Sequence, residues 1–139
     1  MRIIAVDPGV TSGVASAGFI DEPPEFSSWE DGTLGTIRSV AARLHSVDLV
    51  VCESFTPRPG VRTWQPASLE SIGALRYICW RLGTEFKLQT PAEAKRFSTN
   101  AKLASIGWRH PTKGGHADDA ARHLLLAAVR RGLIDVASL

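Results

Sequence analysis

The stretch "IIAVDPGV", residues 3–10, joins four apolar residues to an aspartate, Asp7, that is followed at once by Pro8 and Gly9. A continuous apolar run of this kind predicts a strand that is buried on both faces of a sheet. The Pro-Gly pair turns the chain sharply, so the strand should end at Asp7 and leave its carboxylate at the edge of the sheet. A buried strand that ends on a charge needs a physical reason.

The same pattern returns at residues 49–53, where the sequence reads "LVVCE" and ends on Glu53. If the two strands are parallel neighbours, their spacing of about 4.8 Å brings Asp7 and Glu53 together. Two carboxylates so close at the rim of an apolar core raise each other's pKa and destabilise the fold unless a cation lies between them. A hard divalent metal ion would meet this need, whereas either acid alone would be an ordinary charged residue at a strand end.

The stretch "GGHADDAARH", residues 114–123, opens the last helix that the sequence predicts. His116, Asp119 and His123 are spaced by three and seven residues and therefore share one face of that helix. Imidazole and carboxylate groups together can hold magnesium or manganese. His116 and Asp119 are therefore candidate metal ligands beside the two strand-end acids.

Two further side chains of this helix are assigned to structure rather than to chemistry. Asp118 lies roughly opposite His116 on the helix and four residues before Arg122, so we expect a surface ion pair near the helix N-terminus. A histidine one turn further into a helix is more often a hydrogen-bonded core residue than a ligand, and this is our interpretation of His123.

The remaining pattern predicts an α/β domain with a mixed central sheet flanked by helices. Residues 13–19 and 26–29 carry strand signals between turns, so with residues 3–7 they should form an antiparallel meander. Apolar residues at helical spacing predict a crossover helix at residues 34–44, which leads to a parallel strand at residues 49–53. The elements expected after it are a helix at 67–82, a strand at 86–89, short helices from about residues 91 and 101, and a final helix at 117–131.

The chain has 139 residues, 44% of them apolar, which is typical of one globular domain spanning residues 1–139. The N-terminal apolar run stops at Asp7, and no stretch approaches the roughly 18 apolar residues of a membrane helix. We therefore expect a soluble, cytoplasmic protein with no membrane partner. Cys52 and Cys79 lie in apolar runs and are too few for a disulfide framework or a thiolate zinc site, so they are interpreted as core residues.

Charge is unevenly distributed along the sequence. Residues 1–57 carry 3 basic and 8 acidic side chains, residues 58–113 carry 10 and 3, and residues 114–139 carry 3 and 3. A cationic segment with interleaved aromatic residues is typical of a surface that contacts nucleic-acid phosphates, although a solvated face explains it equally well. The residues concerned are Arg58, Arg62, Lys87, Lys95, Arg96, Lys102, Arg109 and Lys113, with Trp64, Phe97 and Trp108 between them.

Taken in order, these motifs resemble the RuvC-type Holliday junction resolvases of the RNase H-like superfamily, and most closely their small phage-type members. The family opens with a strand that ends in Asp-Pro-Gly with a glycine shortly after it, similar to residues 7–9 and Gly13. A later strand ends in a glutamate, similar to Glu53, and the last helix carries two metal ligands three residues apart, similar to His116 and Asp119. "SLESIGALRYI" and "TPAEAKRF" resemble the family's long helix and its Pro-x-x-x-Lys segment, so the resemblance spans nearly the whole chain.

The resemblance implies an RNase H-like fold and an endodeoxyribonuclease that hydrolyses phosphodiester bonds in branched DNA, with the four-way junction as its main substrate. It implies two Mg²⁺ ions, with Mn²⁺ as a substitute, of which one activates water and the other stabilises the leaving 3'-oxygen. The residues that it implies as both catalytic and metal-binding are Asp7, Glu53, His116 and Asp119.

The resemblance also implies DNA contacts from a basic loop with an aromatic residue after the glutamate strand. The candidates in this sequence are Phe55, Arg58, Arg62 and Trp64, with Lys102 and Arg109 as further phosphate contacts. Packing within the core or the loop explains Phe55 and Trp64 equally well, and a solvated surface explains Lys102 and Arg109 equally well.

Bacterial members of this family are two-fold dimers that cut two opposing strands, which implies a homodimer here. The helix that contains "SLESIGALRYICW", residues 68–80, either forms the dimer contact or only covers the sheet. If a phage encodes the protein, it would act in the cytoplasm of the bacterial host, during DNA recombination or repair.

Three other functions are compatible with parts of the pattern. A nuclease for flaps, forks or single strands would carry the same four site residues and differ only in its loops. A sugar-kinase or actin-type phosphotransferase also has a first strand that leads from an aspartate into a Gly/Thr turn, but it builds its cleft from two such domains. A non-catalytic junction-binding protein would be expected to lose one or more of the acids, and here the set is intact.

Overall fold

The computed structural model describes residues 1–20, 23–55, 65–109 and 115–139. Its centre is a five-stranded mixed sheet with the strand order β3-β2-β1-β4-β5. Strands β1, β2 and β3 form the expected antiparallel meander, and β4 and β5 continue the sheet in parallel with β1. The strands are β1 (Arg2–Asp7), β2 (Thr11–Gly18), β3 (Glu25–Gly32), β4 (Leu49–Glu53) and β5 (Glu85–Gln89).

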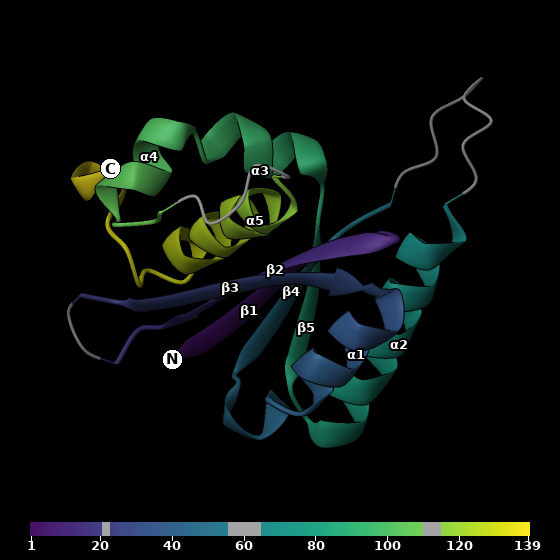
Figure 1. Cartoon of the computed structure of the whole chain (residues 1–139). Helices are drawn as coiled ribbons and strands as arrows, with labels where there is room; N and C mark the ends of the chain where they lie inside the picture. The colour runs from purple at the N-terminus through teal and green to yellow at the C-terminus, as the bar shows by residue number, and fades with distance from the viewer. Residues whose placement is uncertain (21–22, 56–64, 110–114) are drawn as a thin grey trace.

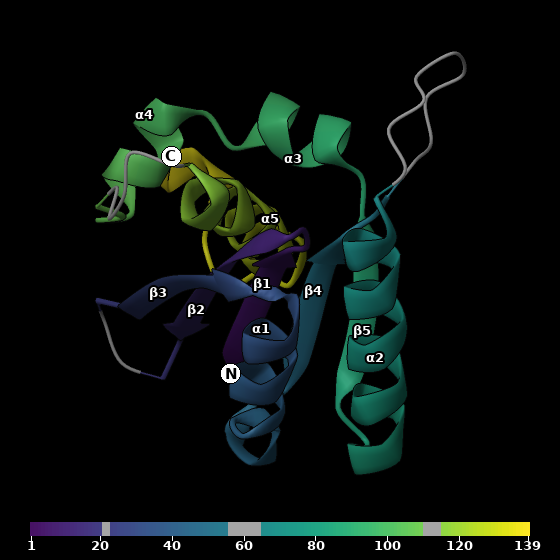
Figure 2. The ribbon, with the colours of Figure 1, turned by 45° about the vertical axis from the view of Figure 1, so that its right-hand side comes forward.

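Helices cover both faces of this sheet, as Figures 1 and 2 show. Helices α3, α4 and α5 lie on one face, and α1 and α2 lie on the other. The helices are α1 (Thr33–Ala41), α2 (Pro66–Leu82), α3 (Pro91–Phe97), α4 (Asn100–Ser105) and α5 (His116–Arg130), with single 3-10 turns at Leu44–Ser46 and Val136–Ser138. No helix in the described ranges combines the length and the apolar character that a bilayer span requires.

The apolar run of β1 is buried on both of its faces, as its sequence predicts. Ile3 and Ala5 point into a core formed with α4 and α5, whereas Ile4 and Val6 point into a second core formed with α1 and α2. All four side chains are fully buried. Each large aliphatic side chain buried in this way contributes roughly 1.5–3 kcal/mol, so β1 joins the two layers.

The two cysteines lie in the second core, as expected. Cys52 on β4 and Cys79 on α2 are both buried free thiols. Burial raises the pKa of the Cys79 thiol to about 11, and burial together with the nearby acids raises the pKa of the Cys52 thiol further. Both thiols therefore remain protonated near neutral pH and act as small apolar groups.

Helix α5 packs unusually close to β2 because β2 presents a glycine at the contact. A Cβ atom at Gly13 would lie 2.0 Å from the carbonyl carbon and oxygen of His116. The backbone N–H of Ala117 also donates to Oε1 of Glu30, at 3.2 Å, which satisfies one of the free donors in the first turn of α5. Gly13 on β2 and Glu30 on β3 thus fix the N-terminus of α5 at the edge of the sheet where β1 ends.

Replacement of Gly13 by alanine should destabilise the fold, because the new methyl group meets backbone that has no freedom to rotate away. The expected loss is on the order of 1–3 kcal/mol or more in the free energy of unfolding, measured by denaturant titration. Gly18→Ala is the matched control on the same strand, since the nearest atom to its Cβ is the side-chain Nε of Arg2 at 3.9 Å. Equal stability of the two variants would contradict the close contact.

Candidate functional site

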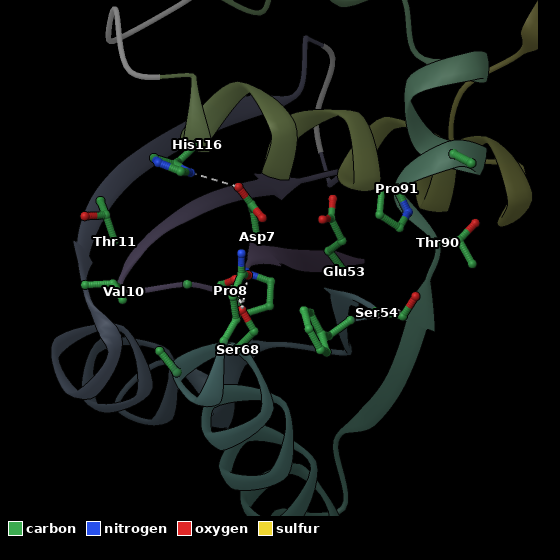
Figure 3. Close-up of a pocket in the computed structure, with 15 residues that line it drawn as sticks. Asp7, Pro8, Val10, Thr11, Glu53, Ser54, Ser68, Thr90, Pro91 and His116 are labelled. Atoms are coloured by element: carbon green, nitrogen blue, oxygen red, sulfur yellow. Dashed lines mark hydrogen bonds and ion pairs between the residues drawn. The ribbon is translucent and has the colours of Figure 1, made fainter. Parts of the chain in front are cut away.

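Asp7 and Glu53 lie on adjacent strands at the same edge of the sheet. The parallel register pairs Val6 with Cys52, so the two acids occupy the next position on each strand. Their side chains are 14% and 19% exposed. The juxtaposition predicted from the two apolar runs is therefore present, and both carboxylates line one cavity (Figure 3).

This cavity has a volume of about 770 Å³ and opens at the end of the sheet where β1 and β4 end. Its walls come from the β1–β2 turn, the residues after β4, and the first turns of α2, α3 and α5. The lining residues are Asp7, Pro8, Gly9, Val10, Thr11, Glu53, Ser54, Phe55, Gln65, Ala67, Ser68, Thr90, Pro91, Ala92 and His116.

Hydroxyl groups hold the β1–β2 turn that carries the first acid. The Ser68 hydroxyl on α2 donates to the carbonyl of Pro8 at 2.8 Å, and the Thr33 hydroxyl on α1 donates to the carbonyl of Gly9 at 3.0 Å. The backbone N–H of Gly9 in turn donates to the Ser12 hydroxyl at 3.1 Å. Both helices on one face of the sheet therefore fix the position at which Asp7 leaves β1.

The pKa of Asp7 is raised from its ordinary value of 3.8 to about 6. Burial is the main cause, and the negative charge of Glu53 is the second. The hydrogen bond from the His116 ring opposes the rise, and the charge of Asp119 adds to it. The charges of Glu53 and Asp119 are thus both close enough to Asp7 to disfavour its ionised form.

His116 lies at the start of α5 and faces the strand-end acids. Its Nδ1 is 3.1 Å from Oδ2 of Asp7, the contact drawn in Figure 3. The imidazole side chain is 45% exposed and lines the cavity, so it remains accessible to a ligand.

Asp119, one turn further along α5, is held by two cations. Its Oδ2 is 3.1 Å from Nζ of Lys95 on α3, and its Oδ1 is 3.4 Å from Nε of Arg122. The expected pairing of Asp118 with Arg122 is wrong, because Arg122 is directed toward Asp119 and the α3–α4 connection. Asp118 instead accepts a hydrogen bond from the Trp108 indole at 2.9 Å.

His123 is buried, as its position in the helix suggested, but it contacts the site. Its Nε2 is 2.8 Å from Oε2 of Glu53, and its Nδ1 is 3.0 Å from Oε1 of Gln89. The sequence signal for this contact was its place on the same helical face as His116 and Asp119. The involvement of Gln89 had no sequence signal of its own.

The carboxylates and the imidazole at this edge of the sheet are suitable ligands for a hard divalent cation. Such a cation prefers carboxylate oxygens, and Mn²⁺ also binds imidazole. Burial is the main cause of the raised pKa of Asp7 and the negative charge of Glu53 is the second, and a bound cation would offset both by stabilising the ionised carboxylate. Within the described ranges, no three such side chains are already gathered as a ligand set. Asp119 would have to turn away from Lys95 or Arg122 before it could join one.

The candidate DNA contacts have different environments. Phe55 lines the cavity and packs partly against the core between the sheet and α2. Lys102 on α4 places its Nζ 4.1 Å from the ring centre of Phe97, and Arg109 is exposed after α4. Arg58, Arg62 and Trp64 lie outside the described residues.

Trp108 is a core residue, not a nucleic-acid contact. It is buried against α5 and packs edge-on to Phe26 with ring centres 5.9 Å apart. Phe97 is also partly buried against the same core. For these two aromatics in the cationic segment, packing is the correct interpretation.

The raised pKa of Asp7 predicts how stability changes with pH in the absence of metal. Below about pH 4 the carboxyl is protonated in both the folded and the unfolded chain and contributes nothing. From about pH 4 to pH 6 the unfolded chain releases the proton first, so the free energy of unfolding falls by at most about 3 kcal/mol and stays lower above pH 6. Asp7→Asn should therefore be more stable than the wild type at pH 7 and equally stable near pH 3.5, measured by thermal unfolding in EDTA.

Glu70→Gln, at an exposed position of α2, provides the control for this measurement. It removes one surface carboxylate without touching the cavity. A gain of equal size in both variants would show that net charge, rather than burial at the sheet edge, is the cause.

Solved structures similar to this one include three Holliday junction resolvase structures. The structure of Thermus thermophilus RuvC matches with a TM-score of 0.68 and 13% sequence identity, covering 96% of this chain and 98% of that chain. T. thermophilus RuvC in complex with Holliday junction substrate matches with a TM-score of 0.67 and 15% identity, covering 96% and 97%. The yeast mitochondrial Holliday junction resolvase Ydc2 matches with a TM-score of 0.50 and 13% identity, covering 91% and 75%.

No protein-family model matches the sequence, and no curated protein sequence matches it. The likeness to the three solved structures is therefore one of fold. It extends over nearly the whole of this chain, whose five-stranded mixed sheet has helices on both faces. The expectation of an RNase H-like α/β fold is confirmed, and this chain has the fold of the RuvC Holliday junction resolvases.

Proposed function

We propose that this protein is a metal-dependent endonuclease that cleaves branched DNA, with the four-way junction as its main substrate. The observation that carries the proposal is the convergence of Asp7, Glu53 and His116 on one open cavity, with Asp119 close enough to raise the pKa of Asp7. These four residues occupy the sheet edge and the helix of a fold whose solved examples include Holliday junction resolvases.

The four proposed ligands would act through position and charge. Asp7 and Glu53 bind from the sheet, and His116 and Asp119 bind from α5. When bound, two Mg²⁺ or Mn²⁺ ions lower the pKa of a water molecule and neutralise charge that develops on the phosphate. In the metal-free chain the pKa of Asp7 is raised to about 6, so below that pH a metal ion would compete with a proton for this carboxylate.

The cationic segment supports DNA as the partner. Residues 58–113 carry 10 basic and 3 acidic side chains. Part of this segment, α3 and α4, lies over the same face of the sheet as α5 (Figure 1). We propose that Lys102 and Arg109 contact phosphates there, and that Phe55 contacts a base from the cavity wall.

The test of this function is cleavage of labelled DNA by the wild type and by Asp7→Asn, in Mg²⁺ or in EDTA. The substrates are a four-way junction, a 5'-flap, a fork, a single strand and a linear duplex. We expect paired symmetric nicks in the junction that are lost in EDTA and in Asp7→Asn, while junction binding in EDTA is retained. Asp135→Asn, an exposed aspartate in the C-terminal segment, is the matched control and should cut like the wild type.

The outcomes of this test separate the alternatives. Preference for flaps, forks or single strands would keep the metal chemistry and change the substrate. Absence of metal-dependent cleavage of any DNA would favour a non-catalytic junction-binding protein. Cleavage by Asp7→Asn at the wild-type rate would contradict the assignment of Asp7.

A homodimer is the second part of the proposal, because paired nicks need two sites and each chain carries one set of site residues. The inner side of α2 packs on the sheet through Ile72, Leu75 and Cys79. Its outer side still exposes Tyr77 and Trp80, and Trp80 is 75% exposed. The helix therefore covers the sheet and also presents an apolar surface to a second copy.

Light scattering at concentrations that saturate junction binding should give about twice the chain mass of 15.0 kDa. Trp80→Ser should shift the protein toward the monomer, because it removes a large apolar side chain from this surface. Leu34→Ser is the control, since Leu34 is 78% exposed on α1 and lies outside the proposed contact. A monomeric wild type under these conditions would remove the dimer from the proposal.

A further inference from the structure

Glu53 differs from the other acids of the site in having a buried hydrogen-bond partner. Its Oε2 is 2.8 Å from Nε2 of His123, and the His123 side chain is 1% exposed. In the described part of the chain, the structure gives Oε1 of Glu53 no hydrogen bond or ion pair. The two oxygens of this carboxylate are therefore not equivalent.

The direction of this hydrogen bond follows from the chemistry of the two groups. An ionised carboxylate only accepts hydrogen bonds, so with Glu53 ionised the proton must be on Nε2 of His123. This holds whichever way the Gln89 amide is turned, because that amide can accept from Nδ1 or donate to it. In each case His123 donates to Oε2 of Glu53.

The His123 ring is itself fixed by its second contact. Gln89 is buried, and its Oε1 is 3.0 Å from Nδ1 of His123. Gln89 on β5 pairs with Glu53 on β4 in the parallel register. The two hydrogen-bond partners of the His123 ring are therefore neighbours on adjacent strands. The backbone N–H of Ser54 donates to the Gln89 carbonyl at 2.8 Å and extends this pairing by one residue.

We propose that His123 is a positioning residue that holds Oε2 of Glu53 and directs the uncontacted Oε1 toward a metal ion. Glu53 would then bind through a single oxygen in a fixed orientation, with Gln89 fixing the ring that holds it. This inference rests on the proposed function, because it concerns the metal site of that nuclease. It gives a role to a buried polar side chain that lies outside the four proposed ligands.

The physical gain is preorganisation. A glutamate side chain at the rim of a cavity has three rotatable bonds, and it loses this freedom when it binds an ion. A partner that fixes the carboxylate beforehand reduces that loss and directs one oxygen to the ion. Removal of such a supporting partner typically weakens metal affinity by 10–100-fold.

The experiment measures Mn²⁺ affinity by electron paramagnetic resonance of the metal-free protein, without DNA. His123→Leu removes the donor at similar volume, and His123→Gln restores a donor near the position of Nε2. Leu124→Ala is the matched control, since Leu124 is the next residue on α5, is fully buried, and belongs to the core between α5 and the sheet. Thermal unfolding and junction binding in EDTA are measured for each variant.

We expect His123→Leu to weaken Mn²⁺ binding by about tenfold or more. His123→Gln should recover most of the affinity, and Leu124→Ala should lose stability but bind Mn²⁺ like the wild type. Junction binding in EDTA should be unchanged in both His123 variants, because the proposed role concerns the metal.

Two results would overturn the inference and leave the proposed function in place. One is wild-type Mn²⁺ affinity in His123→Leu. The other is equal loss of affinity in His123→Gln, His123→Leu and Leu124→Ala, which would mean that the order of α5, and not the donor, matters. A wild type that binds no Mn²⁺ would instead overturn the proposed function, and the role of His123 with it.

Discussion

The structure of the site depends on the parallel pairing of β1 with β4, which places two carboxylates side by side at the edge of a buried sheet. Burial and, second to it, the negative charge of Glu53 raise the pKa of Asp7. Each acid of the site has a hydrogen-bond or ion-pair partner on α5 or on the neighbouring α3. The partners are His116 for Asp7 and His123 for Glu53, each within hydrogen-bond distance, and Arg122 and Lys95 for Asp119, both in ion pairs. The packing of α5 therefore sets the electrostatics of the site.

Sequence predicted the strands and the two acids well because the signal was local. Each of the two central strands is a continuous apolar run that stops on a carboxylate, and burial on both faces requires such a run. The face of α5 was also predictable from helical spacing. The position of α5 along the sheet could not be predicted from the sequence. It depends on the close approach of α5 to Gly13, a contact between residues far apart in the sequence.

The aromatic residues of the cationic segment show why composition alone is ambiguous. Trp108 and Lys102 lie close together in the sequence, yet their environments differ. Trp108 is in the core, whereas the ammonium group of Lys102 lies over the partly buried ring of Phe97. An indole beside basic residues fits both a stacking surface and a core anchor. Trp108 is assigned to the core because it is buried and its indole donates a hydrogen bond to Asp118. This hydrogen bond requires the segment after α4 to fold back onto α5.

A metal site built from acids must also be stable before the metal binds. The three acids differ in how many of their carboxylate oxygens already contact a partner in the metal-free protein. Asp7 and Glu53 each use one oxygen for a histidine, so the other remains open to a ligand. Asp119 uses both oxygens, with Lys95 and Arg122, and must give up at least one contact to bind an ion. Its pair with Lys95 is partly exposed, and such pairs contribute at most about 1 kcal/mol. The acid that has to move is therefore the one with an easily broken contact, while the buried hydrogen bond of Glu53 can persist when the metal binds.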